Sequence, residues 1–182
     1  MKVFARFVVL ISVLFVLSAC VPVAMLEMTK PVEGQQFTVG LTGVVAVNEE
    51  TPVGGLPYLA YRWGDGETEF SVSTQIGLRG GIKQRVTDIF SVAGGLTVPW
   101  VIFSGSDGPA IPFTADVALL VQATPELTLI GRGMFAYLSD LGRTWMGGAN
   151  LVYSQGPWLF EGGFLFSTDG DPIVSASAGY RF

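Results

Sequence analysis

The sequence predicts an all-β protein, folded as an antiparallel up-and-down β-barrel that spans a membrane, and three observations favour this fold class. Apolar and polar residues alternate with a period of two in many short segments, as in strands with one apolar face. Hydrophobic residues make up 49% of the 182 residues, and the mean hydropathy is +0.51. Yet no run of about 18 apolar residues follows residue 26, so the apolar excess is spread over strands rather than gathered in a spanning helix. Aromatic and charged residues fall on opposite faces of these segments, which is typical of strands whose outer face meets lipid.

Residues 1–19 are predicted to form a signal peptide, because Lys2 and Arg6 precede the apolar stretch 7–17. The four residues LSAC at 17–20 resemble the lipobox of bacterial lipoproteins. This resemblance implies that the lipoprotein-processing machinery acylates Cys20 and makes it the first residue of the mature chain. Two other interpretations stay open, namely an ordinary signal peptide cut near Ala24 and an uncleaved anchor over 7–26. Cys20 is the only cysteine in the chain, so no intramolecular disulfide is possible.

Residues 20–36 have mixed polarity and contain Pro22, Pro31 and Gly34, and we expect them to form a lipidated tether that leads to the barrel. Residues 37–182 form the predicted barrel domain. Alternation and turn residues divide this domain into ten segments of about the length that a tilted membrane strand needs, ~9–11 residues. The expected strands are 37–47, 56–64, 68–76, 78–87, 89–102, 111–123, 127–138, 144–154, 158–168 and 172–182. Nine strands result if 68–87 is one strand, and eight are possible if the first segment lies outside the barrel.

The last eleven residues, PIVSASAGYRF, carry the clearest strand pattern of the chain. Val174, Ala176, Ala178, Tyr180 and Phe182 share one face, and polar or small residues separate them. This ending resembles the closing strand of Gram-negative outer-membrane β-barrels. The resemblance implies that Tyr180 and Phe182 form the signal read by the barrel-insertion machinery. It also implies a location in the outer membrane, with membrane lipid and lipopolysaccharide as partners.

An even number of strands puts both ends of the barrel domain on one side of the membrane. With the carboxy terminus in the periplasm, the connections at 48–55, 104–110, 139–143 and 169–171 face outward. The turns at 64–67, 87–88, 124–126 and 155–157 then face the periplasm. Long loops outside and short turns inside are the rule for such barrels, and the tight turn near Gly77 is an exception.

The predicted register points charged residues into the lumen, and this set contains Arg62, Glu69, Arg79, Lys83, Arg85, Asp116, Arg132, Glu161 and Arg181. Charges on the lipid face would cost ~2–4 kcal/mol each at mid-bilayer. Six basic and three acidic groups could line a narrow pathway that prefers anions. Alternatively the lumen is closed, and Asp116 pairs with Arg132 on the adjacent strand. Inward glycines, among them Gly81 and Gly95, either open a small pore or relieve crowding beneath long arginines.

The residue types argue against catalysis. The chain has no histidine, which removes Ser-His-Asp and Cys-His catalysis and histidine-bound zinc. Carboxylates such as Asp116 and Glu161 are expected to be salt-bridge partners, so we expect no catalytic residue, no metal and no cofactor. The formal net charge of −5 argues against nucleic-acid binding.

The predicted function is therefore a structural or envelope-interaction role for a small outer-membrane barrel. One alternative is a narrow channel for small anions. The other is a lipid-tethered soluble β-barrel that binds a hydrophobic ligand.

Overall fold

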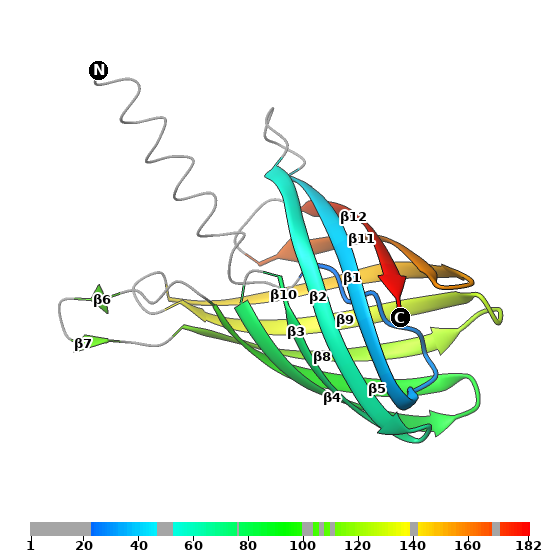
Figure 1. Cartoon of the computed structure of the whole chain (residues 1–182). Helices are drawn as coiled ribbons and strands as arrows, with labels where there is room; N and C mark the ends of the chain where they lie inside the picture. Colours follow the sequence, from blue (N-terminus) through cyan, green and yellow to red (C-terminus); the bar gives the residue numbers. More distant parts are fainter. Residues whose placement is uncertain are drawn as a thin grey trace.

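The computed structural model describes residues 23–46, 53–75, 77–99, 104–105, 108–109, 112–138, 142–168 and 172–182. Within these residues, ten strands close into an antiparallel barrel (Figure 1), which confirms the predicted fold class and strand number. The barrel strands are β1 (Glu33–Ala46), β2 (Val53–Asp65), β3 (Thr68–Thr74), β4 (Gly77–Thr87), β5 (Phe90–Pro99), β8 (Phe113–Gln122), β9 (Leu127–Leu138), β10 (Gly142–Gln155), β11 (Trp158–Ser167) and β12 (Ile173–Arg181). A separate two-stranded pair, β6 (Ser104–Gly105) and β7 (Gly108–Pro109), lies in the connection between β5 and β8.

The carboxy-terminal strand closes the barrel. Strand β12 pairs with β11 on one side and with β1 on the other, in a register that runs from Thr38 opposite Arg181 to Ala46 opposite Ile173. The remaining strands pair with their neighbours in chain order. Because the alternation of β12 leaves a single apolar face outward, this register follows from the pattern that predicted the strand.

The two ends of the barrel differ in their connections. We call the end where β2 leads into β3 the turn end, and the opposite end the loop end. At the turn end the connections are short, and Asp65 illustrates how they are held. The amides of Thr68 and Glu67 donate to the Asp65 carboxylate at 2.7 and 2.9 Å, and these hydrogen bonds hold the pKa of Asp65 below its usual value. Strand β1 begins and β12 ends at this same end.

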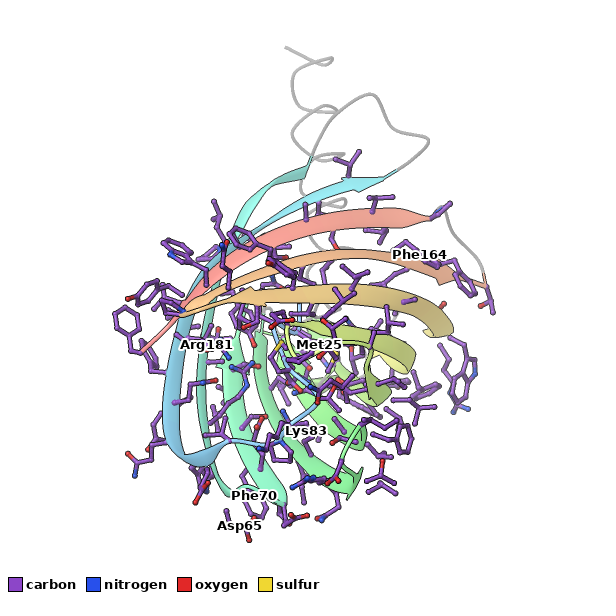
Figure 2. The ribbon with its side chains drawn as sticks, turned by 90° about the vertical axis from the view of Figure 1, so that its right-hand side faces the viewer. Met25, Asp65, Phe70, Lys83, Phe164 and Arg181 are labelled. Atoms are coloured by element: carbon purple, nitrogen blue, oxygen red, sulfur yellow. The ribbon has the colours of Figure 1, made fainter. Side chains whose placement is uncertain are left out.

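The outer face is apolar and the inner face is polar. Large apolar side chains on β10 and β11 are exposed on the outer face, namely Trp145, Leu151, Tyr153, Trp158, Phe160, Phe164 and Phe166. Figure 2 shows Phe70 and Phe164 outside the ribbon and Lys83 and Arg181 inside it. Aromatic rings gather near the turn end, where Tyr180 meets Trp158 at 5.1 Å and Phe182 at 4.8 Å between ring centroids. Such rings are typical of membrane interfaces.

Residues 23–32, which fall within the predicted tether over 20–36, lie inside the barrel. Val23, Ala24, Met25 and Leu26 are at most 4% exposed, and β1 begins at Glu33 rather than at residue 37. A barrel of about eight strands is just filled by its own side chains, and ten strands leave more room. In this chain an extended segment of the same chain occupies that room. No helix in the described ranges is long and apolar enough to cross a membrane.

Candidate functional site

The candidate functional site is the lumen, and its main occupant is the segment 23–32, which we call the lumen segment. A single extended chain inside a barrel has no neighbouring strand to satisfy its backbone amides and carbonyls. Leaving such groups unpaired in a buried place costs free energy comparable to a lost hydrogen bond each. The lumen must therefore supply polar side chains as partners, and the charged inward residues of the strands do so.

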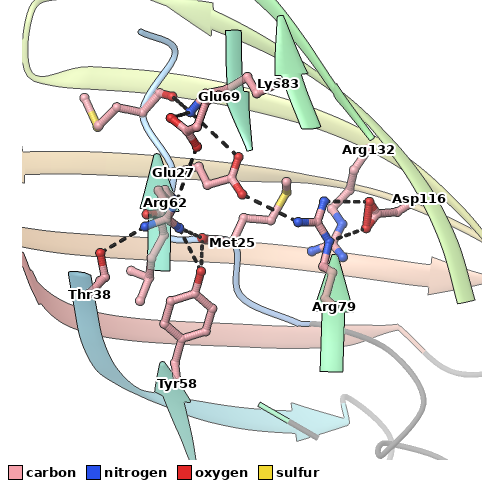
Figure 3. A network of polar contacts seen from close by, with 12 residues as sticks. Met25, Glu27, Thr38, Tyr58, Arg62, Glu69, Arg79, Lys83, Asp116 and Arg132 are labelled. Carbon is pink, nitrogen blue, oxygen red and sulfur yellow. Dashed lines mark hydrogen bonds and ion pairs between the residues drawn. The ribbon is translucent and has the colours of Figure 1, made fainter. Parts of the chain in front are cut away.

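The centre of the lumen segment is held by partners from two strands, β11 and β2. Glu161 on β11 accepts hydrogen bonds from the amide of Met25 at 3.0 Å and from the amide of Leu26 at 2.5 Å. From the other side of the chain, the Tyr58 hydroxyl donates to the Met25 carbonyl at 2.7 Å. The guanidinium of Arg62 donates to the same carbonyl at 3.0 Å (Figure 3). Donors and acceptors of the backbone are thus both satisfied by side chains.

Each end of the lumen segment is held in the same way. Near the loop end, Arg132 donates to the Val23 carbonyl at 3.1 Å, and the Gln75 side chain accepts from the Val23 amide at 3.1 Å. Near the turn end, Lys83 donates to the Met28 carbonyl at 3.1 Å. There the Glu69 carboxylate accepts from the amide of Val32 at 2.8 Å. Hydrogen bonds to charged groups contribute more than neutral ones, about 1.5–3 kcal/mol each, so these contacts hold the segment firmly.

Two glycines form a socket for the Leu26 side chain. Gly40 on β1 and Gly179 on β12 stand opposite each other in the ladder that closes the barrel. A Cβ atom built on either glycine would lie 2.9 Å from Leu26 Cδ1, closer than real contacts allow. The absence of side chains at these two positions therefore makes room for Leu26 and fixes which residue of the segment lies there.

An ionic network surrounds the lumen segment (Figure 3). Arg79 and Asp116 form a bidentate pair, with Nε to Oδ1 and Nη2 to Oδ2 both at 2.8 Å. Glu27, from the lumen segment, lies 3.8 Å from Arg79 and 4.0 Å from Lys83. Lys83 also lies 2.9 Å from Glu69, which in turn lies 3.5 Å from Arg62. Carboxylates and cations therefore alternate through the lumen, and one of the carboxylates belongs to the amino-terminal segment itself.

The inward glycines at 81 and 95 accommodate Arg79. A Cβ at Gly81 would lie 2.6 Å from Arg79 Nη1, and one at Gly95 would lie 2.6 Å from the same guanidinium. Gly95 is on β5, which lies between β4, the strand of Arg79, and β8, the strand of Asp116. In these two ladders Gly95 stands opposite Gly81 and opposite Asp116. This finding agrees with the interpretation in which these glycines relieve crowding beneath a long arginine. The guanidinium reaches across β5 through the space that Gly95 leaves.

The structure places the predicted lumen residues in two groups. Arg62, Glu69, Arg79, Lys83, Asp116, Arg132 and Glu161 are buried around the lumen segment. Arg85 lies at the turn end, opposite Ser91 in the β4–β5 ladder, and pairs with Glu67 at 3.0 Å and with Asp88. Arg181 is also near the turn end and donates to Ser154 Oγ at 2.7 Å and to the Gly156 carbonyl.

Other site predictions fare differently. The partner of Asp116 in the ion pair is Arg79, two strands away, and not Arg132 on the adjacent strand, so that pairing was wrong. Tyr180 and Phe182 lie at the turn end, where their rings contact each other. Cys20 lies outside the described residues. Glu27 was not among the predicted lumen residues, because it falls in the predicted tether. Tyr58 was not among them either, although the alternation of the second strand points this side chain inward.

A cavity of about 370 Å³ remains at the turn end, between the lumen segment and the wall. Lys30, Gln35, Gln122, Thr128 and Arg181 are among its lining residues. In the described part of the chain, no group of three or more carboxylate, cysteine or histidine side chains is placed to hold a metal ion.

No protein-family model and no curated protein matches the sequence. Among solved structures the chain is similar to a KdgM porin, with a TM-score of 0.51, 9% identity and coverage of 81% of this chain and 99% of the porin. A structure of de novo designed transmembrane β-barrels matches with a TM-score of 0.41, 12% identity and coverage of 84% and 99%. The Ail protein of Yersinia pestis in a nanodisc matches with a TM-score of 0.37, 15% identity and coverage of 85% and 99%. At 9% identity the likeness to the porin concerns the fold alone.

Proposed function

We propose that this chain is a small, non-catalytic barrel of the Gram-negative outer membrane, with a closed lumen and a structural or envelope-interaction role. The observation that carries this proposal is the lumen segment, which occupies the space through which solutes would pass. The outward apolar face and the terminal Tyr180 and Phe182 support the membrane location and recognition by the barrel-insertion machinery. Membrane lipid and lipopolysaccharide are the partners that such a location supplies. Acylation of Cys20 by the lipoprotein-processing machinery belongs to the same proposal.

The charges of the lumen favour a closed barrel over an anion channel. The sequence suggested six basic and three acidic inward groups, which is a surplus of three positive charges. Arg85 and Arg181 belong to the turn end, and Glu27 joins the lumen from the amino-terminal segment. Among the described residues the buried set is then Arg62, Arg79, Lys83 and Arg132 against Glu27, Glu69, Asp116 and Glu161. Four positive and four negative charges give no net preference for anions.

The arrangement also gives little support to a tethered soluble binder. Such a protein needs an apolar cavity inside and a polar surface outside. Here the lumen contains ion pairs, and Val117, Leu119 and Phe164 are among the exposed outward residues. The buried carboxylates are engaged too, because Asp116 pairs with Arg79 and Glu161 accepts the amides of the lumen segment. This engagement supports a non-catalytic role.

Conductance across a planar bilayer tests the closed lumen. We expect the purified protein to be silent, and we expect a variant that lacks residues 23–30 to pass current. A cold-versus-boiled gel shift on both proteins serves as the control for folding, because a folded membrane barrel changes mobility on heating. Steady current through the unaltered, folded protein would show that the lumen is open and would favour the channel. Absence of the gel shift together with a water-soluble Cys20→Ser form would contradict the membrane barrel itself.

A further inference from the structure

The lumen segment has a direction, because its two ends lie at opposite ends of the barrel. Val32 is at the turn end, where its carbonyl accepts from the amide of Gly66 at 3.1 Å and where β1 begins opposite Asp65. Val23 is near the loop end. It packs in a buried cluster with Val44, close to the end of β1, and with Leu56, Met134 and Leu165. The chain therefore enters the lumen at one mouth and approaches the other.

The length of the segment matches a passage through the membrane. Ten extended residues span at most about 33–36 Å. The hydrocarbon core of a bilayer is about 30 Å thick. The contacts of Val23, Met25, Met28 and Val32 follow the lumen from near the loop end to the turn end. The segment falls short of full extension, because Leu26 has a φ of 45° and the chain bends at residues 29–30.

We infer that the barrel threads its own amino-terminal segment through the lumen and thereby presents the residues that precede Val23, Cys20 among them, at the cell exterior. The inference rests on the proposed function for its orientation, in which the short turns and the carboxy terminus face the periplasm. Two residues, Val21 and Pro22, separate Cys20 from Val23, and the three steps between these positions reach about 10–11 Å at most. The periplasmic face lies about 30 Å from the outer face. A lipid on Cys20 would consequently enter the outer leaflet of the membrane and not the inner one.

The lumen is suited to hold any extended backbone, yet it fixes one register. Glu161, Arg62 and Arg132 bind backbone amides and carbonyls, which every residue of the segment offers. The glycine socket accepts the Leu26 side chain and so selects the position of the chain. The barrel thus surrounds the lumen segment and determines how far the residues that precede Val23 extend beyond the loop end.

Accessibility of an epitope on intact cells tests this inference. A short epitope is inserted between Pro22 and Val23 of the full chain, so that the lipobox is unchanged. Matched controls carry the same epitope in the 48–55 loop or in the 124–126 turn. We expect antibody to label the first two proteins on intact cells, and to label the third only after the outer membrane is permeabilised.

The controls separate failure of the inference from failure of the proposed function. If the 48–55 epitope is labelled on intact cells and the epitope before Val23 is not, the threading is wrong and the outer-membrane barrel stands. If the 48–55 epitope is also hidden, the proposed orientation is wrong, and the inference falls with it.

A disulfide test remains decisive if the inserted epitope disturbs folding. In a Cys20→Ser form of the full chain, Val23→Cys is combined with Leu165→Cys near the loop end or with Thr128→Cys near the turn end. Thr128 contacts Thr29, at 3.1 Å between hydroxyl oxygens, and so lies six residues further along the lumen segment. We expect oxidation to link residue 23 to residue 165 and not to residue 128, read as a mobility difference on non-reducing gels. Linkage to residue 128, or to neither position, would overturn the threading.

Discussion

The Leu26 socket offers the most direct test of how firmly the lumen segment is held. Leu26 is 1% exposed, and its side chain faces the backbone of Gly40 and Gly179. Replacing it by Ala leaves a cavity. The two glycines cannot move together to fill it, because they stand opposite each other in the hydrogen-bonded ladder of β1 and β12. Leu→Ala changes at such sites cost about 2–5 kcal/mol.

We expect the substitution to destabilise the closed state, in which the lumen segment is bound inside the barrel, and to leave the hydrogen-bonded strand ladder unchanged. A loss of about 2 kcal/mol, the lower limit, raises the fraction of open segment by about 30-fold, since each 1.4 kcal/mol is a factor of ten. Hydrogen exchange measured by mass spectrometry on the peptide covering 23–32 reports this opening. The amides of Met25 and Leu26 are the sensitive ones, because they donate to Glu161.

Lys30→Ala is the matched control, since Lys30 is an exposed residue of the same segment. We expect it to leave the exchange of the segment unchanged, and we expect both variants to keep the heat-dependent gel shift. Two results would refute the reasoning. One is unaltered exchange in Leu26→Ala. The other is an unaltered protein whose segment exchanges as fast as an unstructured peptide, because the segment would then not be held in the lumen at all.

Three further predictions concern the ion pair and the outer face. Gly95→Ala places a methyl group against the Arg79 guanidinium and should lower the midpoint of urea unfolding, whereas Ala at an outward position of the same strand should not. Asp116→Ala removes the bidentate partner of the buried Arg79 guanidinium and should cost about 3–5 kcal/mol, while the double variant with Arg79→Ala should cost less than the sum of the two single changes in equilibrium unfolding. Additive costs would argue against the pair. Val117→Arg, in the middle of β8 on the outer face, should cost ~2–4 kcal/mol, and Val86→Arg, near the turn end, only ~0–1 kcal/mol. Equal costs in lipid vesicles would contradict the membrane register.

Strand positions and faces could be predicted from the sequence because they depend on local patterns. The alternation of β12 and the aromatic residues of β11 determine which side chains point outward, since a shift of one residue would expose every charge to lipid. The seven buried charges of the strands follow from the same argument. Arg85 follows the same alternation, opposite Ser91, but it lies at the turn end, where Glu67 and Asp88 of the turns pair with it.

Partners within the lumen could not be predicted in this way. The sequence suggested that Asp116 pairs with Arg132, because the two residues are on adjacent strands. Side chains that point inward, however, also meet side chains from strands that are not adjacent. Arg79 reaches Asp116 over β5 because Gly95 leaves the path open. Pairing inside a barrel therefore depends on side-chain length and on the space at intervening positions, which the spacing of residues along one strand does not contain.

Alternation and turn residues act over a few neighbouring positions, so they predicted an antiparallel barrel with an apolar outer face and ten, nine or eight strands. The closed sheet has ten strands. The residues that fill the barrel could be identified only from the folded chain. Residues 23–32 have the mixed polarity of a linker, and nothing within them marks a buried segment. They become buried because Glu161, Arg62, Arg132, Lys83 and Glu69, supplied by strands far along the chain, satisfy a backbone that has no strand beside it.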